Sequence, residues 1–200
     1  MNHNNRIGTP NSTPGHQLGF TLLEVMVVLA IVGILAKMAA PAFSELVANY
    51  NLKQLRNAIY KSANLARAQA INRGTCVAIC MTQPTTAVGS MSCVANTDTT
   101  GNLSNWASGW MVFEYPACST VEKNTTAALD KIIYLQPAFP DQYQLIRATG
   151  TDGFMYNSSG VAYNGSGSFK IQENNAATPY ELICISWLGK LTSKKGSVCA

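Results

Sequence analysis

The sequence has few charged residues and almost no histidine. Asp, Glu, Lys and Arg make up 12% of the 200 residues, whereas an average soluble domain carries about 25%. The formal net charge is only +4, which is too small to attract a nucleic acid or a membrane surface unless the basic residues cluster locally. The two histidines, His3 and His16, both precede the first hydrophobic segment.

This shortage of histidine limits the chemistry of the chain. A Ser-His-Asp or Cys-His catalytic site and a His-ligated zinc each need an imidazole. Residues 1–19 are rich in Ser, Thr, Asn and Pro and read as a processed leader, so removing them leaves no histidine. We therefore expect no enzymatic activity, no catalytic residue, no cofactor and no metal.

A long apolar segment begins at Phe20. Over the roughly 24 residues to Phe43 it carries only two charges, Glu24 and Lys37, and about 20 apolar residues suffice for a helix to cross a bilayer. A secretory signal peptide cut near 40–42 is the alternative. However, a carboxylate in such a segment costs about 2.5–3.5 kcal/mol and serves no purpose in a discarded peptide. We therefore expect a retained membrane helix in which Glu24 pairs with a nearby new N-terminal amine.

The junction Gly19-Phe20-Thr21-Leu22-Leu23-Glu24 resembles the cleavage and methylation site of type IV prepilins. The resemblance implies that prepilin peptidase cuts after Gly19 and that Phe20 becomes the N-methylated N-terminus. It also implies that Glu24 neutralises an N-terminal amine during subunit docking and so sets the axial register. Pro41 stands where such proteins often have a helix-kinking proline. Lys37 departs from the pattern, and either its long stem snorkels to the membrane face or it meets an acid of a neighbouring subunit.

The rest of the chain changes from helical to strand-like patterning near Gly74. Apolar residues recur every three to five positions as far as Ala70, so one helix is expected from Phe20 to about Arg73, with basic side chains on its solvated face. Seven short strand-like runs follow without a helical period between them, which predicts an antiparallel sheet. They are 76–81, 110–115, 131–136, 144–148, 153–156, 168–172 and 180–187, with loops expected at 95–104 and 157–167.

The predicted fold class is thus α+β and pilin-like, with a long N-terminal helix packed on a β-rich antiparallel head. Its parts are the leader (1–19), the helix (20–73, transmembrane over 20–43) and the head (74–200). The runs 65–73, 106–113 and 183–190 add to the resemblance, which is to minor pilins and pseudopilins of the GspH/FimT type.

That family resemblance implies a function, partners and a location. It implies a minor pilin that helps to initiate and build a type IV pilus, or alternatively a minor pseudopilin of a type II secretion system. The implied partners are other pilins, bound through the N-terminal helix, together with prepilin peptidase and the inner membrane. The implied location is a single-pass inner-membrane protein with a periplasmic head, and later the pilus fibre at the cell surface.

All six cysteines follow the apolar segment, which fits an oxidising compartment in which disulfides persist. Six cysteines allow fifteen pairings. We favour Cys184 with Cys199, because this bond ties the last strand to the tail, and Cys80 with Cys93 as a second pair. Metal or redox use is disfavoured, since three residues and not two separate Cys76 from Cys80 and no second close pair exists.

A second function is suggested by the C-terminal lysines. Some members of the resembling family bind DNA for uptake in natural transformation through a Gly-Arg-x-Arg motif. Here the stretch reads Gly189-Lys190-Leu191-Thr192-Ser193-Lys194-Lys195, with lysine and threonine in place of the two arginines. Lys190, Lys194 and Lys195 are therefore candidate contacts to double-stranded DNA, bound weakly and without sequence readout. Trp187 is either a base-stacking residue or, more simply, part of the core.

Overall fold

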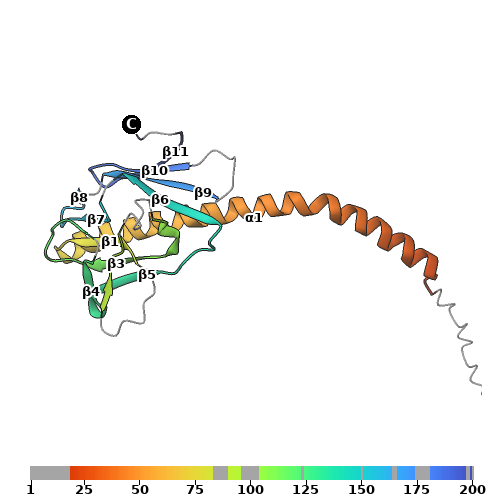
Figure 1. Ribbon diagram of the computed structural model, residues 1–200, viewed down its shortest axis with the longest axis horizontal. Coiled ribbons are helices and arrows are strands. Elements are labelled where there is room, and N and C mark those ends of the chain that lie inside the picture. Colours follow the sequence, from red (N-terminus) through yellow and green to blue (C-terminus); the bar gives the residue numbers. More distant parts are fainter. Residues whose placement is uncertain are drawn as a thin grey trace, which may run out of the picture. The chain divides into compact units, whose positions relative to one another are not determined.

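The computed structural model describes residues 19–82, 90–95, 104–122, 124–149, 151–163, 166–173, 181–196 and 199. The chain divides into two units, Met1–Glu45 and Leu46–Ala200. Helix α1 (Leu22–Arg73) provides the described helix of the first unit and continues into the second, where it meets the sheets (Figure 1).

In the second unit, α1 is amphipathic, and its apolar stripe packs on the head. Leu55, Ile59, Ala63, Ala66 and Ala70 are all fully buried, and their spacing of three or four residues places them on one helix face. The helix ends in a Schellman arrangement: Gly74 has φ +65°, and the next amide, of Thr75, donates to the Ala70 carbonyl at 3.3 Å.

Among the described residues, nine of the eleven strands belong to two antiparallel sheets. The first sheet has the order β5 (Ile132–Gln136), β3 (Trp110–Glu114), β1 (Val77–Met81), β7 (Gly153–Tyr156) and β8 (Ala162–Tyr163). The second has the order β11 (Leu191–Lys195), β10 (Glu181–Ile185), β9 (Gly167–Glu173) and β6 (Tyr143–Thr149). A small ribbon pairs β2 (Ser90–Ser92) with β4 (Thr126–Ala128), and two 3₁₀ turns are η1 (Trp106–Ser108) and η2 (Leu129–Lys131).

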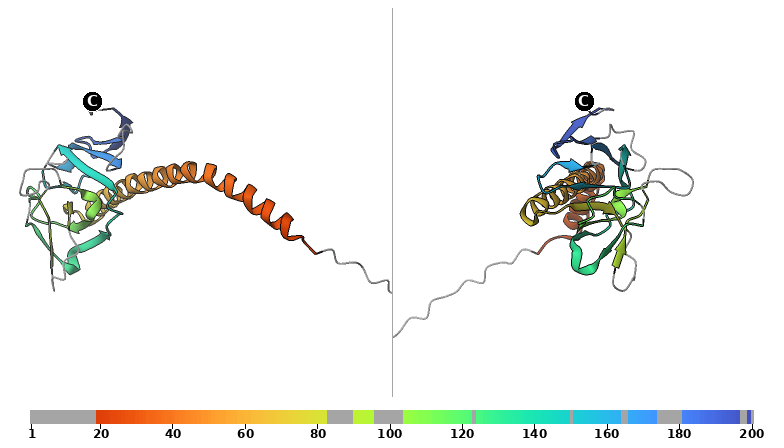
Figure 2. Two further views of the ribbon diagram at one scale, coloured as in Figure 1. Left: turned by 45° about the vertical axis from the view of Figure 1, so that its right-hand side comes forward. Right: turned by 90° about the vertical axis from the view of Figure 1, so that its left-hand side faces the viewer.

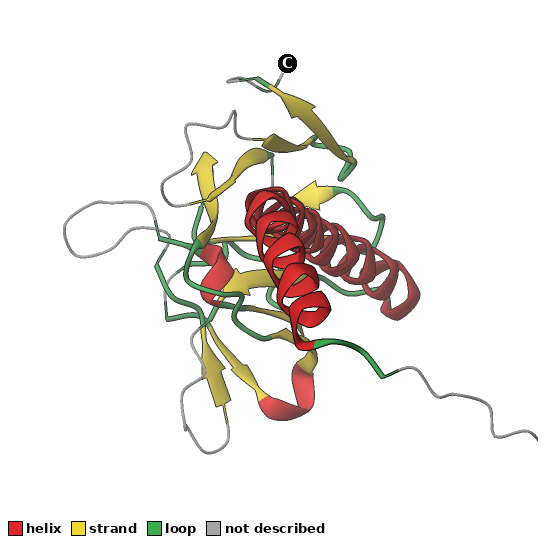
Figure 3. Cartoon of the chain, turned by 90° about the vertical axis from the view of Figure 1, so that its right-hand side faces the viewer, coloured by secondary structure: helices red, strands yellow, loops and turns green. Residues whose placement is uncertain are grey.

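In Figure 2 the blue strands of the second sheet and the yellow and green strands of the first lie at opposite ends of the head. Figure 3 shows strands of both sheets around the part of α1 that lies in the head.

The first sheet is buried on both faces, because alternate side chains of its central strand β1 enter two different apolar clusters. Val77 and Ile79 pack with the buried stripe of α1, while Ala78 and Cys80 pack in a second cluster on the other face. The larger cluster also holds Trp110, whose indole Nε1–H donates to Ser62 Oγ of α1 at 2.8 Å. This buried hydrogen bond fixes the helix against the sheet.

The predicted fold class is confirmed, but several boundaries are not. The helix begins at Leu22 rather than Phe20, and the expected strand 180–187 is wrong at its end, because 186–190 form a turn with Gly189 at φ +77°. Strands β2, β4, β8 and β11 were not predicted, and β8 lies inside the expected loop 157–167. Leader residues 1–18 and loop residues 96–103 lie outside the described residues.

Candidate functional site

The junction expected to be cut precedes the helix. Gly19 and Phe20 are exposed and non-helical, and such segments are the preferred sites of proteolytic cleavage. The helix is capped by Thr21, whose Oγ1 accepts a hydrogen bond from the Glu24 amide at 3.2 Å. Glu24 itself lies in the first turn of α1, where a carboxylate interacts favourably with the helix dipole.

The apolar part of α1 has no partner within its own unit. Within the part of the chain that the structure describes, one helix is long and apolar enough to cross a membrane, and none of its most apolar stretch is buried. Glu24 and Lys37 are both exposed on this helix. The helical backbone continues through Pro41. A helix that is apolar on every face is stable only in a membrane or against other apolar helices.

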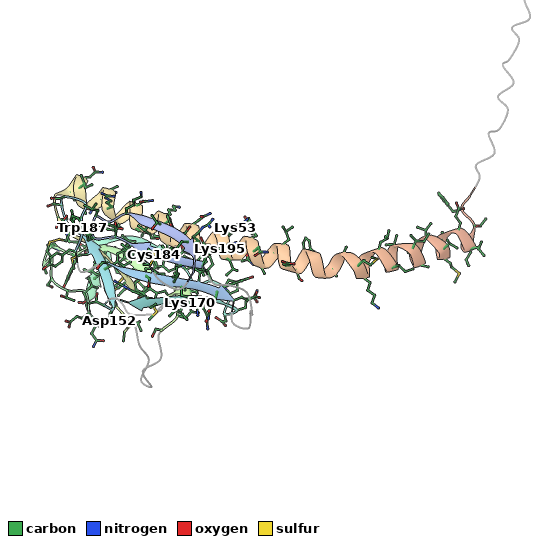
Figure 4. All side chains as sticks on the ribbon, turned by 90° about the horizontal axis from the view of Figure 1, so that it is seen from above. Lys53, Asp152, Lys170, Cys184, Trp187 and Lys195 are labelled. Carbon is green, nitrogen blue, oxygen red and sulfur yellow. A yellow bond between two sulfur atoms is a disulfide. The ribbon has the colours of Figure 1, made fainter. Side chains whose placement is uncertain are left out.

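In the head, basic residues from distant parts of the sequence line one groove of about 530 Å³. Lys53 and Arg56 come from α1, whereas Lys194 and Lys195 come from the edge strand β11. Figure 4 shows Lys53 and Lys195 side by side. The remaining lining residues are Asn49, Leu52, Ile171, Gln172, Glu181 and Ser193.

One ion pair fixes the two walls of this groove to each other. Arg56 Nη1 lies 3.0 Å from Glu181 Oε1 and 3.3 Å from Oε2, and both side chains are about 30% exposed. Beside them, burial raises the pKa of the Tyr60 hydroxyl, and a hydrogen bond with the Ser193 side chain opposes that shift. Polar contacts therefore join α1 to strands β10 and β11 in this groove.

The third candidate lysine lies elsewhere. Lys190 belongs to the turn between β10 and β11, where its amide donates to Ser186 Oγ at 3.2 Å. Lys194 and Lys195 pair with Leu182 and Glu181 at the opposite end of the hairpin. Trp187, in the same turn as Lys190, is 68% exposed, so the expectation that it packs in the core is wrong.

The structure joins the cysteines in three disulfides. It brings together Cys184 with Cys199 and Cys80 with Cys93, the two pairs favoured from the sequence, and it adds Cys76 with Cys118. Among the described residues, no group of three or more His, Cys, Asp or Glu side chains is arranged to hold a metal.

Sequence reasoning missed a buried arginine in the core of the head. Arg147 of β6 is fully buried, and its guanidinium carbon lies 5.2 Å from the ring centre of Phe154, 5.8 Å from that of Phe169 and 5.9 Å from that of Trp106. Burial lowers the pKa of this guanidinium to about 10, and the charge of Asp152 partly opposes the shift. The period-two pattern of β6 is the signal that could have found it, because Arg147 shares a face with buried Tyr143 and Leu145.

Comparison with known proteins identifies the family. The model of the type II transport protein GspH matches residues 56–189, and the prokaryotic N-terminal methylation motif matches residues 15–39. The chain belongs to the GspH family. It is a minor pilin or pseudopilin of the GspH/FimT kind, and the methylation motif fits a membrane-anchored pilin.

Individual proteins also resemble this GspH-family chain. The fimbrial protein EcpC of Eikenella corrodens is 49% identical over 41 residues, which cover 20% of this chain and 27% of that protein. The type IV minor pilin FimU of Pseudomonas aeruginosa, solved in two crystal forms, is 12% and 11% identical, each with a TM-score of 0.46. These matches cover 73% and 76% of this chain and 91% and 90% of FimU.

Proposed function

We propose that this chain is a minor pilin that helps to initiate and build a type IV pilus after prepilin peptidase cuts the bond that follows Gly19. The observation that carries the proposal is the apolar half of α1, which is exposed on every face and directly follows the exposed Gly19-Phe20 junction. Such a helix is suited first to the inner membrane and then to a bundle of pilin helices.

In this proposal Glu24 sets the register of docking. Cleavage after Gly19 leaves the amine of Phe20, which is methylated, only four residues from Glu24. Among apolar helices a carboxylate without a partner is costly, so the subunit docks where Glu24 meets an N-terminal amine. Pro41 is then a site where the helix lacks one backbone donor and can bend.

The head is proposed to fold outside the inner membrane before it joins the fibre. Three disulfides support an oxidising compartment such as the periplasm. The local match to a fimbrial protein favours a pilus, whereas the description of the family model favours a type II secretion pseudopilus. Recovery of the chain in filaments sheared from the cell surface supports the pilus.

The test compares Glu24→Gln with a matched control, Glu45→Gln, which removes an exposed carboxylate of α1 beyond the apolar segment. Mass spectrometry of the membrane-extracted wild type should show an N-methylated Phe20. We expect Glu24→Gln to lower the amount in sheared filaments at least about tenfold, equivalent to about 1.4 kcal/mol, with unchanged cleavage and membrane level. An intact leader, a cut near residue 42 or equal incorporation of both variants contradicts the proposal.

DNA binding for natural transformation is a second candidate function. The observation that favours it is the position of Lys194 and Lys195 in one groove with Lys53 and Arg56, since clustered cations bind the phosphate backbone by releasing counterions. The full chain in neutral detergent is titrated with duplex DNA at several salt concentrations. In a Lys194→Ala/Lys195→Ala variant, the slope of the logarithm of the binding constant against the logarithm of the salt concentration should fall in magnitude by about 2. If the wild-type chain binds no duplex at low salt, it is an assembly subunit only.

A further inference from the structure

We propose that the basic groove binds the headgroup of an anionic phospholipid while the subunit is anchored in the membrane. The groove is the one lined by Lys53, Arg56, Lys194 and Lys195. This inference rests on the proposed function, because it requires the apolar half of α1 to lie in a bilayer. The lipid would occupy the groove while the subunit is still in the membrane, before it joins the filament.

The position of the groove along the chain favours a lipid. The helix wall of the groove starts at Asn49, six residues after the apolar segment ends at Phe43. Lys53, in the same wall, lies ten residues after Phe43. At about 1.5 Å per residue, ten helical residues rise about 15 Å. The polar layer of a bilayer occupies roughly the first 5–7 Å of that rise, and a lysine side chain can extend toward it. The short separation along the chain therefore allows this wall to reach the headgroups when 20–43 is anchored in a bilayer.

The charge of the groove favours an anion. Four cationic side chains face one carboxylate, Glu181, which leaves a formal charge of +3. Arg56 is held by Glu181, whereas Lys53, Lys194 and Lys195 are exposed and form no ion pair with the described residues. Three exposed ammonium groups are suited to phosphate oxygens, for which lysine acts as a point charge.

The lining of the groove also includes apolar surface. Leu52 is half-buried and Ile171 is buried, and both line the same groove as the cations. A phospholipid presents a phosphate next to a glycerol backbone and acyl carbons, so it matches cations beside apolar side chains. A DNA backbone presents phosphates and sugars and gains little from the half-buried Leu52. The combination favours the lipid as the occupant.

The test uses the full chain in neutral detergent, with bound lipid counted by native mass spectrometry. Phosphatidylglycerol is the anionic probe and phosphatidylcholine the neutral one. The groove variant is Lys53→Gln/Lys194→Gln/Lys195→Gln. The matched control, Lys61→Gln/Lys131→Gln/Lys190→Gln, loses the same charge from exposed positions outside the groove.

We expect the wild type to prefer phosphatidylglycerol over phosphatidylcholine at least about tenfold. The groove variant should lose about fivefold in phosphatidylglycerol affinity per lysine, which corresponds to about 1 kcal/mol each, and the control should keep most of its affinity. Equal binding of both lipids, or equal losses in the two variants, overturns the proposal. So does a groove variant that loses duplex DNA binding but keeps phosphatidylglycerol binding. Thermal unfolding of both variants checks that each is folded.

This test and that of the proposed function fail independently. Lipid binding is measured on purified protein, while assembly is measured as the amount in sheared filaments. A chain that assembles normally without lipid preference refutes the lipid site alone, and a chain with an uncut leader refutes the proposed function.

Discussion

Replacing Arg147 tests whether the free-energy cost of desolvating its guanidinium exceeds the stabilisation from its aromatic contacts. Burial lowers its pKa from the ordinary arginine value to about 10, and each pKa unit corresponds to 1.36 kcal/mol. Holding the cation in the folded head at neutral pH therefore costs about 3 kcal/mol. The three surrounding aromatic rings oppose this cost through cation–π interactions, each worth roughly 0.5–2 kcal/mol.

Two substitutions separate the charge from the volume. Arg147→Met keeps most of the side-chain volume and removes the charge, so we expect the free energy of unfolding to stay constant or to rise by about 1–2 kcal/mol. Arg147→Ala leaves a cavity among Trp106, Phe154 and Phe169 and should lower it by about 3 kcal/mol or more. Both values are measured by urea unfolding of the full chain in detergent, followed by tryptophan fluorescence.

The pH dependence provides a second measurement with a defined sign. Because the pKa of Arg147 is lowered to about 10 in the folded chain, the unfolded chain binds more protons from about pH 10 up to the ordinary pKa of arginine. This group therefore contributes increasing stability as the pH rises through that window, and Arg147→Met should lack the contribution. A loss of more than about 2 kcal/mol in Arg147→Met at neutral pH would show that the aromatic contacts outweigh desolvation and refute the reasoning.

Three further predictions concern the head. Replacing Cys184 and Cys199 by alanine should lower the free energy of unfolding by about 3 kcal/mol, because their disulfide closes a loop between residues 15 positions apart. Urea unfolding with the other disulfides intact measures this loss. Ser62→Ala should cost about 1–3 kcal/mol in the same assay, because it leaves the buried Trp110 indole N–H without its acceptor. Glu181→Gln should tighten phosphatidylglycerol binding in native mass spectrometry, and weaker binding would contradict the charge argument for the groove.

The parts of the molecule that could be predicted from sequence depend on local patterns. The buried stripe of α1 follows from its three-to-four-residue spacing, and its end follows from Gly74. Strands with apolar residues, such as β1 and β10, were predicted to within two residues. Strand β11 was not, because Thr192, Ser193 and the two lysines after it have no apolar alternation.

The groove could not be predicted because neither of its walls is unusual in sequence. Lys53 and Arg56 have the spacing of an ordinary solvated helix face, and Lys194 and Lys195 read as a short basic tail. Only the pairing of β11 with β10, together with the ion pair from Arg56 to Glu181, brings these four cations into one site. The same pairing places Lys190 at the far end of the hairpin. The sequence therefore grouped Lys190 with Lys194 and Lys195, whereas the groove joins Lys194 and Lys195 to Lys53 and Arg56. The cluster of charge on this head is therefore a property of the sheet register, because a one-residue shift between β10 and β11 would turn each β11 side chain to the other face of the sheet.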